Sequence, residues 1–384
     1  MKRSILLTIT ISLMSLPING ITSSFQDFQR QQQQGFADFK KDFDQSFKEY
    51  QKSFKQAFES YQEELKSNWS QPLITDRHLW VEYYQDNTSR SIVDFENNEI
   101  RIELDNKRTD DPSNKAVELL FNVMSRSIND AVENDEVTQR AISNAGLPND
   151  SLGLSGHDRV LSEVNPAHIE EKLGNAKVSH RQEPSSDGDK RNIIILTVPL
   201  PATRTTDKAR EFLPLVNRYA KQYNIEPALI LAIMHSESSF NPMARSHIPA
   251  FGLMQIVPGS AGKDVAQEVY GEIRVFTPTY LYNPENNIRA GAVYLNILNT
   301  RYLRQIDNPE SRLYAVISAY NTGAGNVSRT FTGNSNSPAR AAQIINTMQP
   351  MQVYSHLHSQ LPYEETRKYL EHVAKRTIAY RNFN

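Results

Sequence analysis

Aromatic and apolar residues recur in the first part of the chain at a spacing typical of one long helix. From residue 36 to residue 65 they are separated by three, four and four residues, and this order then repeats. Such a period corresponds to about 3.67 residues per turn, so these side chains share one face of an α-helix. We therefore predict an amphipathic helix over residues 21–66, with an aromatic stripe formed by Phe36, Phe39, Phe43, Phe47, Tyr50, Phe54, Phe58, Tyr61 and Leu65.

The aromatic stripe needs a partner because a row of aromatic side chains would otherwise expose a large apolar surface. Packing onto the following part of the chain or onto a second copy is one interpretation. Attachment to a membrane surface through residues 36–65 is another. Membrane-surface helices usually carry mostly basic residues on their polar face, whereas this polar face mixes acids and bases. The sequence favours packing or self-association and leaves peripheral membrane attachment open.

The first residues of the chain have the composition of an export signal. Met1-Lys2-Arg3 is basic and is followed by a mostly apolar run that ends before Pro17. That run is shorter than the roughly 20 apolar residues a membrane-spanning helix needs. We predict a signal peptide over residues 1–20 and export to the periplasm, with an uncleaved anchor as the alternative. The chain has 0 Cys, which excludes a disulfide framework, thiol catalysis and a lipid anchor on cysteine.

Length and hydrophobic pattern divide the rest of the chain into two domains. A chain of 384 residues exceeds one compact domain of ordinary size. We expect an α+β N-terminal domain over residues 67–200, with a helical region at 114–144 and strands at 80–84, 91–95, 99–104 and 192–198. We expect an all-α domain over residues 201–384, with helices at 207–223, 227–238, 259–270, 284–304, 310–320, 338–347 and 363–381.

One acidic residue of the all-α domain lies where an acid is disfavoured. Ile230, Ile233 and Glu237 share one face of the expected helix at 227–238, and that face is otherwise apolar. Burial and the negative end of the helix dipole would both raise the pKa of this carboxyl. A carboxylic acid that stays protonated near neutral pH can serve as a general acid. A capping or salt-bridged glutamate is the structural alternative.

Four short segments change the balance between these interpretations. They are residues 237–242 (ESSFNP), 252–256 (GLMQI), 319–325 (AYNTGAG) and 365–369 (ETRKY). Each is weak by itself, but in this order they resemble the four signature blocks of the soluble-lytic-transglycosylase family, whose members cleave peptidoglycan glycan strands. The resemblance implies a lysozyme-like catalytic domain, similar to goose-type lysozyme, over residues 201–384, with a glycan groove and Glu237 as the acid/base.

Further segments resemble one membrane-bound member of this family. They are residues 84–91, 212–216, 230–234, 261–265, 307–309 and 342–348. That member is usually lipid-anchored through a cysteine, which this chain lacks. The resemblance thus implies an enzyme of the periplasm, and any association with the outer membrane would not use a lipidated Cys.

The resemblance also suggests a mechanism. Ordinary glycosidases use two carboxylates, but we count one in the four blocks, and the next acid along the chain, Asp264, lies outside them. A single acid fits cleavage of the MurNAc-β-1,4-GlcNAc bond in which the sugar's own C6 hydroxyl closes a 1,6-anhydro ring. No cofactor or metal is expected. A hydrolytic muramidase and a non-catalytic peptidoglycan-binding protein remain the alternatives.

The other expected site residues follow from chemistry and resemblance together. Amides suit the N-acetyl groups of the sugars, tyrosines stack on sugar rings, and the two serines could position the acid. An apolar wall is expected from the methionine, for which plain core packing is the alternative. The expected substrate-binding residues are Ser238, Ser239, Met254, Gln255, Tyr320, Asn321 and Tyr369. The expected partner is the peptidoglycan glycan strand, and a net charge of −2 gives no reason to expect nucleic acid.

Overall fold

The computed structural model describes residues 19–84, 87–147, 153–154, 158–184 and 190–383. The signal peptide expected over residues 1–20 lies almost entirely outside them and stays a prediction. No helix in this described part is long and apolar enough to cross a bilayer. The chain forms two compact units, residues 1–46 and 47–384, and the boundary falls inside helix α1 (Asn19–Lys66).

The second part of α1 belongs to the larger unit and packs on it. Tyr50, Phe54 and Leu65 are buried, and Phe47 and Phe58 are partly buried against the same core. From residue 47 onward, the aromatic stripe is therefore covered by the chain's own core. The side chains at positions 36, 39 and 43 lie outside those that the structure describes.

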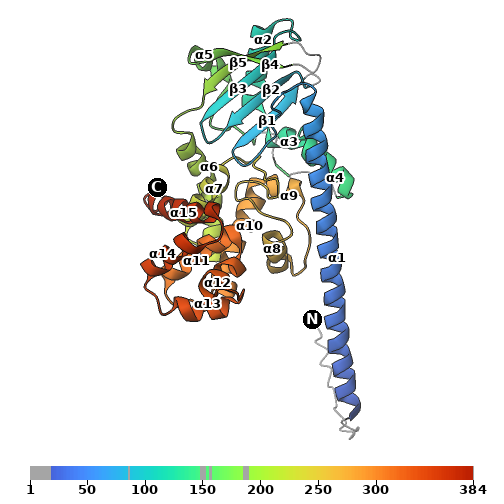
Figure 1. The fold of residues 1–384 in the computed structure, drawn as a ribbon, viewed down its shortest axis with the longest axis vertical. Coiled ribbons are helices and arrows are strands. Elements are labelled where there is room, and N and C mark those ends of the chain that lie inside the picture. Colours follow the sequence, from blue (N-terminus) through green and yellow to red (C-terminus); the bar gives the residue numbers. More distant parts are fainter. Residues whose placement is uncertain (1–18, 85–86, 148–152, 155–157, 185–189, 384) are drawn as a thin grey trace, which may run out of the picture. The chain divides into compact units, whose positions relative to one another are not determined.

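A five-stranded antiparallel sheet forms the centre of the α+β part (Figure 1). Its order is β1-β2-β3-β5-β4, with β1 (Leu79–Tyr84), β2 (Ser89–Asp94), β3 (Glu99–Asp105), β4 (Lys177–Pro184) and β5 (Lys190–Pro199). Asn98 makes the β2–β3 turn with a φ of 55°, a left-handed conformation that asparagine tolerates. Strand β4 was not predicted, because its residues are almost all polar and exposed.

Short helices flank the sheet. The helical region expected at 114–144 is divided into three, because Ser127 and Asp135 each cap the start of a new helix with their side chains. Of these three, α2 packs on β2 and β3. The helices of this part are α2 (Pro112–Ser125), α3 (Ile128–Glu133), α4 (Glu136–Ala145), the 3₁₀ turn η1 (Pro166–His168) and α5 (Ile169–Gly174).

The chain from residue 204 onward is helical, as expected. Its elements are α6 (Arg204–Tyr223), α7 (Pro227–Ser238), α8 (Ala261–Tyr270), α9 (Pro278–Tyr282), α10 (Pro284–Ile297), the π-helical turn η2 (Leu298–Tyr302), α11 (Pro309–Thr322), α12 (Ala324–Thr332), α13 (Pro338–Ile345), α14 (Pro350–Gln360) and α15 (Glu364–Arg381). Helices α9, α12 and α14 were not predicted. The central helix is α7, which packs against α6 and α15 and is buried along most of its length.

Candidate active site

Glu237 lies in the last turn of the central helix. Helix α7 begins with Pro227, whose missing N–H is not needed in the first turn. It ends because Ser239 and Phe240 adopt left-handed φ angles of 50° and 61°. The Glu237 side chain is buried, with the residue only 4% exposed. The carboxyl therefore sits inside the helical domain at the point where the chain leaves the helix.

Burial raises the pKa of Glu237 to about 7. The positive charge of Arg77 and the hydroxyl of Tyr369 act in the opposite direction, and the negative charge of Glu365 adds to the increase. Arg77 is shared between two acids, because its guanidinium also lies 2.6 Å from the carboxylate of Glu365. The site thus holds an acid that is partly protonated at neutral pH, as a general acid requires.

Ser238, which directly follows the acid, connects α7 to the loop at 250–256. Ser238 is fully buried, and its hydroxyl donates to the carbonyls of Met234, 3.0 Å away, and Leu253, 2.9 Å away. The Ser239 hydroxyl faces a ring nitrogen of His78 at 3.4 Å. These contacts connect the end of α7 to the loop at 250–256 and to the chain before β1.

Hydrogen bonds from α10 fix the loop at 250–256. Asn287 of α10 donates to the carbonyls of Phe251 and Leu281, and its side-chain oxygen accepts from the N–H of Met254. Gly252 has a φ of +74°, and an added Cβ would lie 2.4 Å from Asn287 and from a backbone oxygen. No other residue fits at position 252, which explains the glycine of this block.

Two side chains of the same loop have different surroundings. Met254 is completely buried, and its sulfur lies against Gly291 of α10, so it packs in the core rather than lining a surface. Gln255 is 7% exposed with a left-handed φ of 48°. Its amide N–H donates to the Gly252 carbonyl, whereas its buried side-chain oxygen has no hydrogen-bond partner among the described residues.

Tyrosines from two further helices reach the acid. Tyr320 of α11 donates its hydroxyl to the Met254 carbonyl at 2.8 Å, and Tyr369 of α15 is buried beside Glu237. Burial and the nearby carboxylate raise the pKa of both tyrosines well above the ordinary value. Within the described part of the chain, the Tyr369 hydroxyl has no hydrogen bond of standard geometry. Asn321 accepts a 2.7 Å hydrogen bond from Thr366, which joins α11 to α15.

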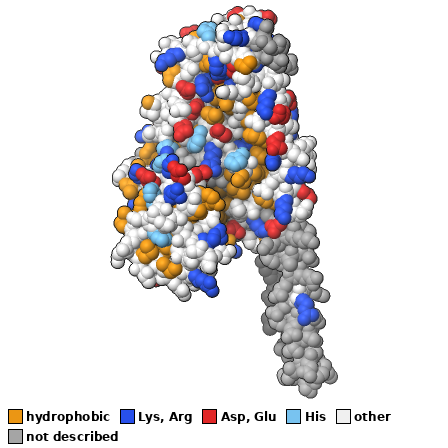
Figure 2. Space-filling view, in the orientation of Figure 1, with side chains coloured by type: hydrophobic (Ala, Val, Ile, Leu, Met, Phe, Trp, Pro, Cys, Tyr) orange, Lys and Arg blue, Asp and Glu red, His pale blue; other side chains and the backbone are white. Residues whose placement is uncertain are grey.

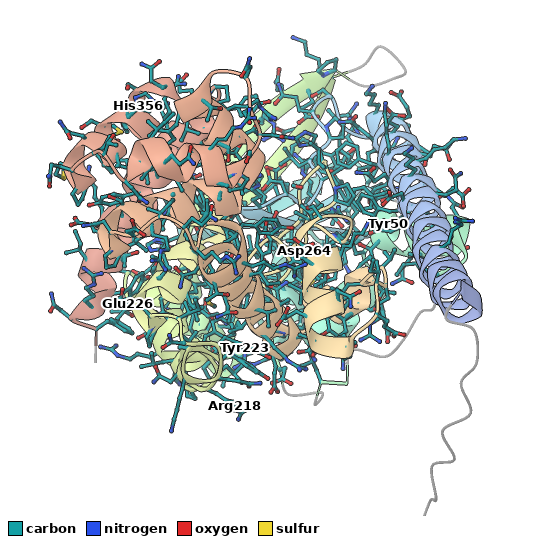
Figure 3. All side chains as sticks on the ribbon, turned by 90° about the horizontal axis from the view of Figure 1, so that it is seen from below. Tyr50, Arg218, Tyr223, Glu226, Asp264 and His356 are labelled. Carbon is teal, nitrogen blue, oxygen red and sulfur yellow. The ribbon has the colours of Figure 1, made fainter. Side chains whose placement is uncertain are left out.

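The structure thus brings Glu237, Tyr320 and Tyr369 together, and Ser238 and Tyr320 connect them to the 250–256 loop. Figure 2 shows hydrophobic side chains gathered near the middle of one face, in the region where Figure 1 labels α9 and α10. A separate cavity of about 630 Å³ lies at the other end of α7, beside Glu226, which Figure 3 labels. None of the expected site residues lines that cavity.

Three residues near the acid were missed by the sequence analysis. Arg77 and His78 come from the α+β part, where no site residue was expected, and no motif marks them. Glu365 belongs to the fourth block, so counting one carboxylate in the four blocks was wrong. Asp264, the acid that the sequence places outside the four blocks, lies on α8 (Figure 3) and accepts a hydrogen bond from Tyr302. Within the described residues, no cluster of three or more His, Asp or Glu could hold a metal ion.

The four blocks come together at the end of α7. Ser238 and Tyr320 donate to the loop that carries Gln255, and Asn321 accepts from Thr366 of the fourth block. Residues 214–343 match the family described as "Transglycosylase SLT domain". The match is confined to this part of the helical domain, and it confirms the predicted resemblance to the soluble-lytic-transglycosylase family.

Curated relatives narrow the match further. The chain is similar to membrane-bound lytic murein transglycosylase C of Sodalis glossinidius, with 47% identity over 50% of this chain and 52% of the relative. It is 45% identical to the protein of the same name from Klebsiella pneumoniae, over the same shares. The chain thus spans about half the length of the curated relatives it matches. Among solved structures, the chain is similar to the 70 kDa soluble lytic transglycosylase of Escherichia coli, with 30% identity, a TM-score of 0.34, and coverage of 44% of this chain and 24% of that one.

Proposed function

We propose that this chain is a peptidoglycan lytic transglycosylase in which Glu237 acts first as acid and then as base. One observation carries the proposal: Glu237 is a fully buried carboxyl whose pKa is raised to about 7, at the end of the central helix of an SLT domain. Such a group is protonated often enough to donate to a leaving oxygen and is ionised often enough to accept a proton afterwards.

The reaction proceeds in two proton transfers. Glu237 donates its proton to the oxygen between N-acetylmuramic acid and N-acetylglucosamine, and the bond from that oxygen to C1 of the muramic acid breaks. The N-acetyl group of the same sugar stabilises the positive charge at C1, as in substrate-assisted glycosidases. Glu237 then accepts the proton of the C6 hydroxyl, whose oxygen bonds to C1. The products are a free 4-hydroxyl and a 1,6-anhydro end, without consumption of water.

The neighbouring residues divide into substrate contacts and supports. Gln255 has a buried oxygen without a partner, which suits the N–H of a sugar N-acetyl group. Tyr369 has a buried hydroxyl beside the acid, which suits the reacting oxygens. Their orientation depends on Ser238, Tyr320 and Asn321, whose polar groups are already bonded to neighbouring parts of the protein. Met254 supports the fold of the loop at 250–256, and Ser239 supports the turn at the end of α7.

Product analysis on purified peptidoglycan tests the proposal. The wild type should release fragments with non-reducing 1,6-anhydro ends, identified by mass. Glu237→Gln should lower the rate by about 10²–10⁴-fold, which is the usual contribution of a general acid. Reducing ends in place of anhydro ends would favour a hydrolytic muramidase, in which the nearby Glu365 would supply the second carboxylate. Unchanged activity in the Glu237 variant would overturn the assignment.

We also propose that the chain works after export to the periplasm, because its start has the form of a signal peptide and its relatives are named membrane-bound. Residues 21–66 would form one amphipathic helix. Since Tyr50 and Phe54 are buried against the chain's own core, self-association or attachment to a membrane surface would rest on residues 36–46. Sedimentation as a monomer, together with no binding to lipid vesicles, would contradict both roles.

A further inference from the structure

The chain just before the sheet reaches into the helical domain at the end of α7. Four hydrogen-bond contacts join residues 75–78 to the chain that follows Glu237. The Arg245 side chain and backbone N–H donate to the carbonyls of Thr75 and Asp76, the Asn241 amide donates to the Arg77 carbonyl, and Ser239 contacts His78, at distances of 3.4, 3.2, 3.4 and 3.4 Å. The position of residues 76–78 is therefore fixed by the same loop that ends the catalytic helix.

This arrangement carries the side chain of Arg77 to the acid. Its guanidinium lies 2.6 Å from the carboxylate of Glu365, at the start of α15. Both side chains reach solvent, with 37% of Arg77 and 66% of Glu365 exposed. Glu237 itself is buried, and its carboxyl responds to both charges. A partly exposed ion pair thus acts on the buried carboxyl from outside its own helix.

The charged and titratable groups around Glu237 come from three elements besides its own. Arg77 comes from the chain before β1, Tyr320 from α11, and both Glu365 and Tyr369 from α15. Arg77 is the cation among them. His235, on the same helix as Glu237, instead faces Tyr380 at 3.1 Å.

We propose that Arg77, supplied by the α+β part, is a positioning residue of the transglycosylase site, and that with Glu365 it sets the charge around the Glu237 carboxyl. This inference rests on the proposed function, because it concerns the same acid. The α+β part would thereby take part in the reaction instead of serving only as a scaffold or targeting domain.

The pair balances two opposite effects. Arg77 favours the ionised form of Glu237, whereas Glu365 favours the protonated form. Removing the cation should therefore raise the pKa of Glu237, and removing the anion should lower it. Removing both should leave it near the wild-type value. An exposed ion pair contributes little to stability, so these variants should fold normally and differ in titration.

The pH dependence of kcat/KM on purified peptidoglycan tests this assignment. Because the free enzyme must hold Glu237 protonated, its rate falls on the alkaline side as the acid ionises. In Arg77→Gln the alkaline limb should move up by about one pH unit, the low end of the effect of an opposite charge close by. In Glu365→Gln the alkaline limb should move to lower pH. In the double variant and in Arg77→Lys it should lie at the wild-type position.

A matched control removes an exposed ion pair elsewhere. Arg218 of α6, labelled in Figure 3, lies 2.8 Å from Glu285 of α10, and both side chains are exposed. Arg218→Gln should leave the limb unchanged. If the wild type is active and the Arg77 and Glu365 variants have the limb of the control, the inference is wrong while the proposed function stands.

A second measurement does not depend on activity. The ¹³C resonance of the Glu237 side-chain carboxyl, assigned by its loss in Glu237→Gln, reports the ionisation of this group directly. Its midpoint should rise in Arg77→Gln and fall in Glu365→Gln. An inactive wild type would contradict the proposed function, and equal midpoints in all variants would contradict the role of Arg77, so the two failures remain distinct.

Discussion

At the scale of single residues, the burial that raises the pKa of Glu237 also lowers the stability of the folded protein. A carboxyl loses hydration when it is buried, and here its nearest cation is engaged with another carboxylate. The folded state therefore holds the proton of Glu237 up to a pH of about 7, whereas the unfolded chain releases it near the ordinary 4.5. Between these two values the folded state binds more protons than the unfolded state, so this residue makes stability fall as the pH rises.

Glu237→Gln should remove this dependence. The difference between about 7 and 4.5 corresponds to on the order of 3 kcal/mol, which the folded wild type loses between the two pH values. The glutamine variant should thus be more stable than the wild type at pH 8 and similar to it at pH 4. Urea denaturation at both pH values measures the difference. Equal stabilities at pH 8 would contradict the burial of an ionisable carboxyl at this position.

The residues also show how far the sequence could define the site. Helical spacing placed Glu237 among Ile230 and Ile233, so burial and the direction of its pKa shift followed from local pattern. Arg77 could not be found this way, because it lies 160 positions earlier in the chain and only tertiary contacts bring it to α7. The interior position of Met254 also depends on a distant residue, Gly291, which leaves space for its sulfur.

At the scale of elements, strongly periodic segments were predictable and short ones were not. The spacing in α7 and α15, the alternation in β3 and the apolar run of β5, closed by prolines, identified these elements. Helix α12 follows directly after Gly323 and α14 begins with Pro350. Both are short, so little periodicity marks them. Strand β4 is recognisable only from its pairing with β5, because its own residues are mostly exposed and polar.

The second part of α1 packs on the loop at 250–256, which gives a prediction for that element. Phe54 is 1% exposed, and its ring packs edge to face on the ring of Phe251, with centroids 5.8 Å apart. Tyr50, which lies on the same helix, is labelled in Figure 3. Phe251 directly precedes Gly252 in the loop that carries Gln255. Phe54→Ala should therefore destabilise the protein by about 3–5 kcal/mol and raise KM more than it lowers kcat.

Phe58→Ala provides the comparison, because Phe58 lies one turn further along α1 and is only partly buried. It should have a smaller effect on stability and no effect on KM. Urea denaturation and steady-state kinetics on peptidoglycan measure both quantities. Equal KM values in the two variants would show that α1 stabilises the fold without supporting the loop.

At the scale of the whole molecule, residues 47–384 form one compact unit although sequence patterns divide them into an α+β part and a helical part. A buried ion pair joins the two. Arg245 of the helical part is 2% exposed, and one of its nitrogens lies 2.7 and 2.8 Å from the two oxygens of Asp135, in the α+β part. No sequence pattern indicated this pair, because the two residues are 110 positions apart.

Asp135→Asn tests whether this pair couples the two parts. Asp135 also caps α4 by accepting from the N–H of Thr138, and asparagine caps a helix about equally well, so the variant removes the charge and keeps the cap. It leaves the buried Arg245 without a counter-charge and should destabilise the protein by about 3–5 kcal/mol. Replacing Arg245 by Met in that background should recover part of the loss, because the unpaired charge is then gone.

A double-mutant cycle in urea, with Arg245→Met alone as the fourth corner, measures the coupling. The cycle also bears on how the two parts unfold. If the pair joins them into one cooperative unit, fluorescence and circular dichroism should give coincident transitions in the wild type and separated transitions in Asp135→Asn. A loss below about 1 kcal/mol with coincident transitions in every variant would mean that apolar packing alone unites the two parts. The position of Arg77 near Glu237 would then depend on the hydrogen bonds of residues 75–78 and not on the Arg245–Asp135 pair.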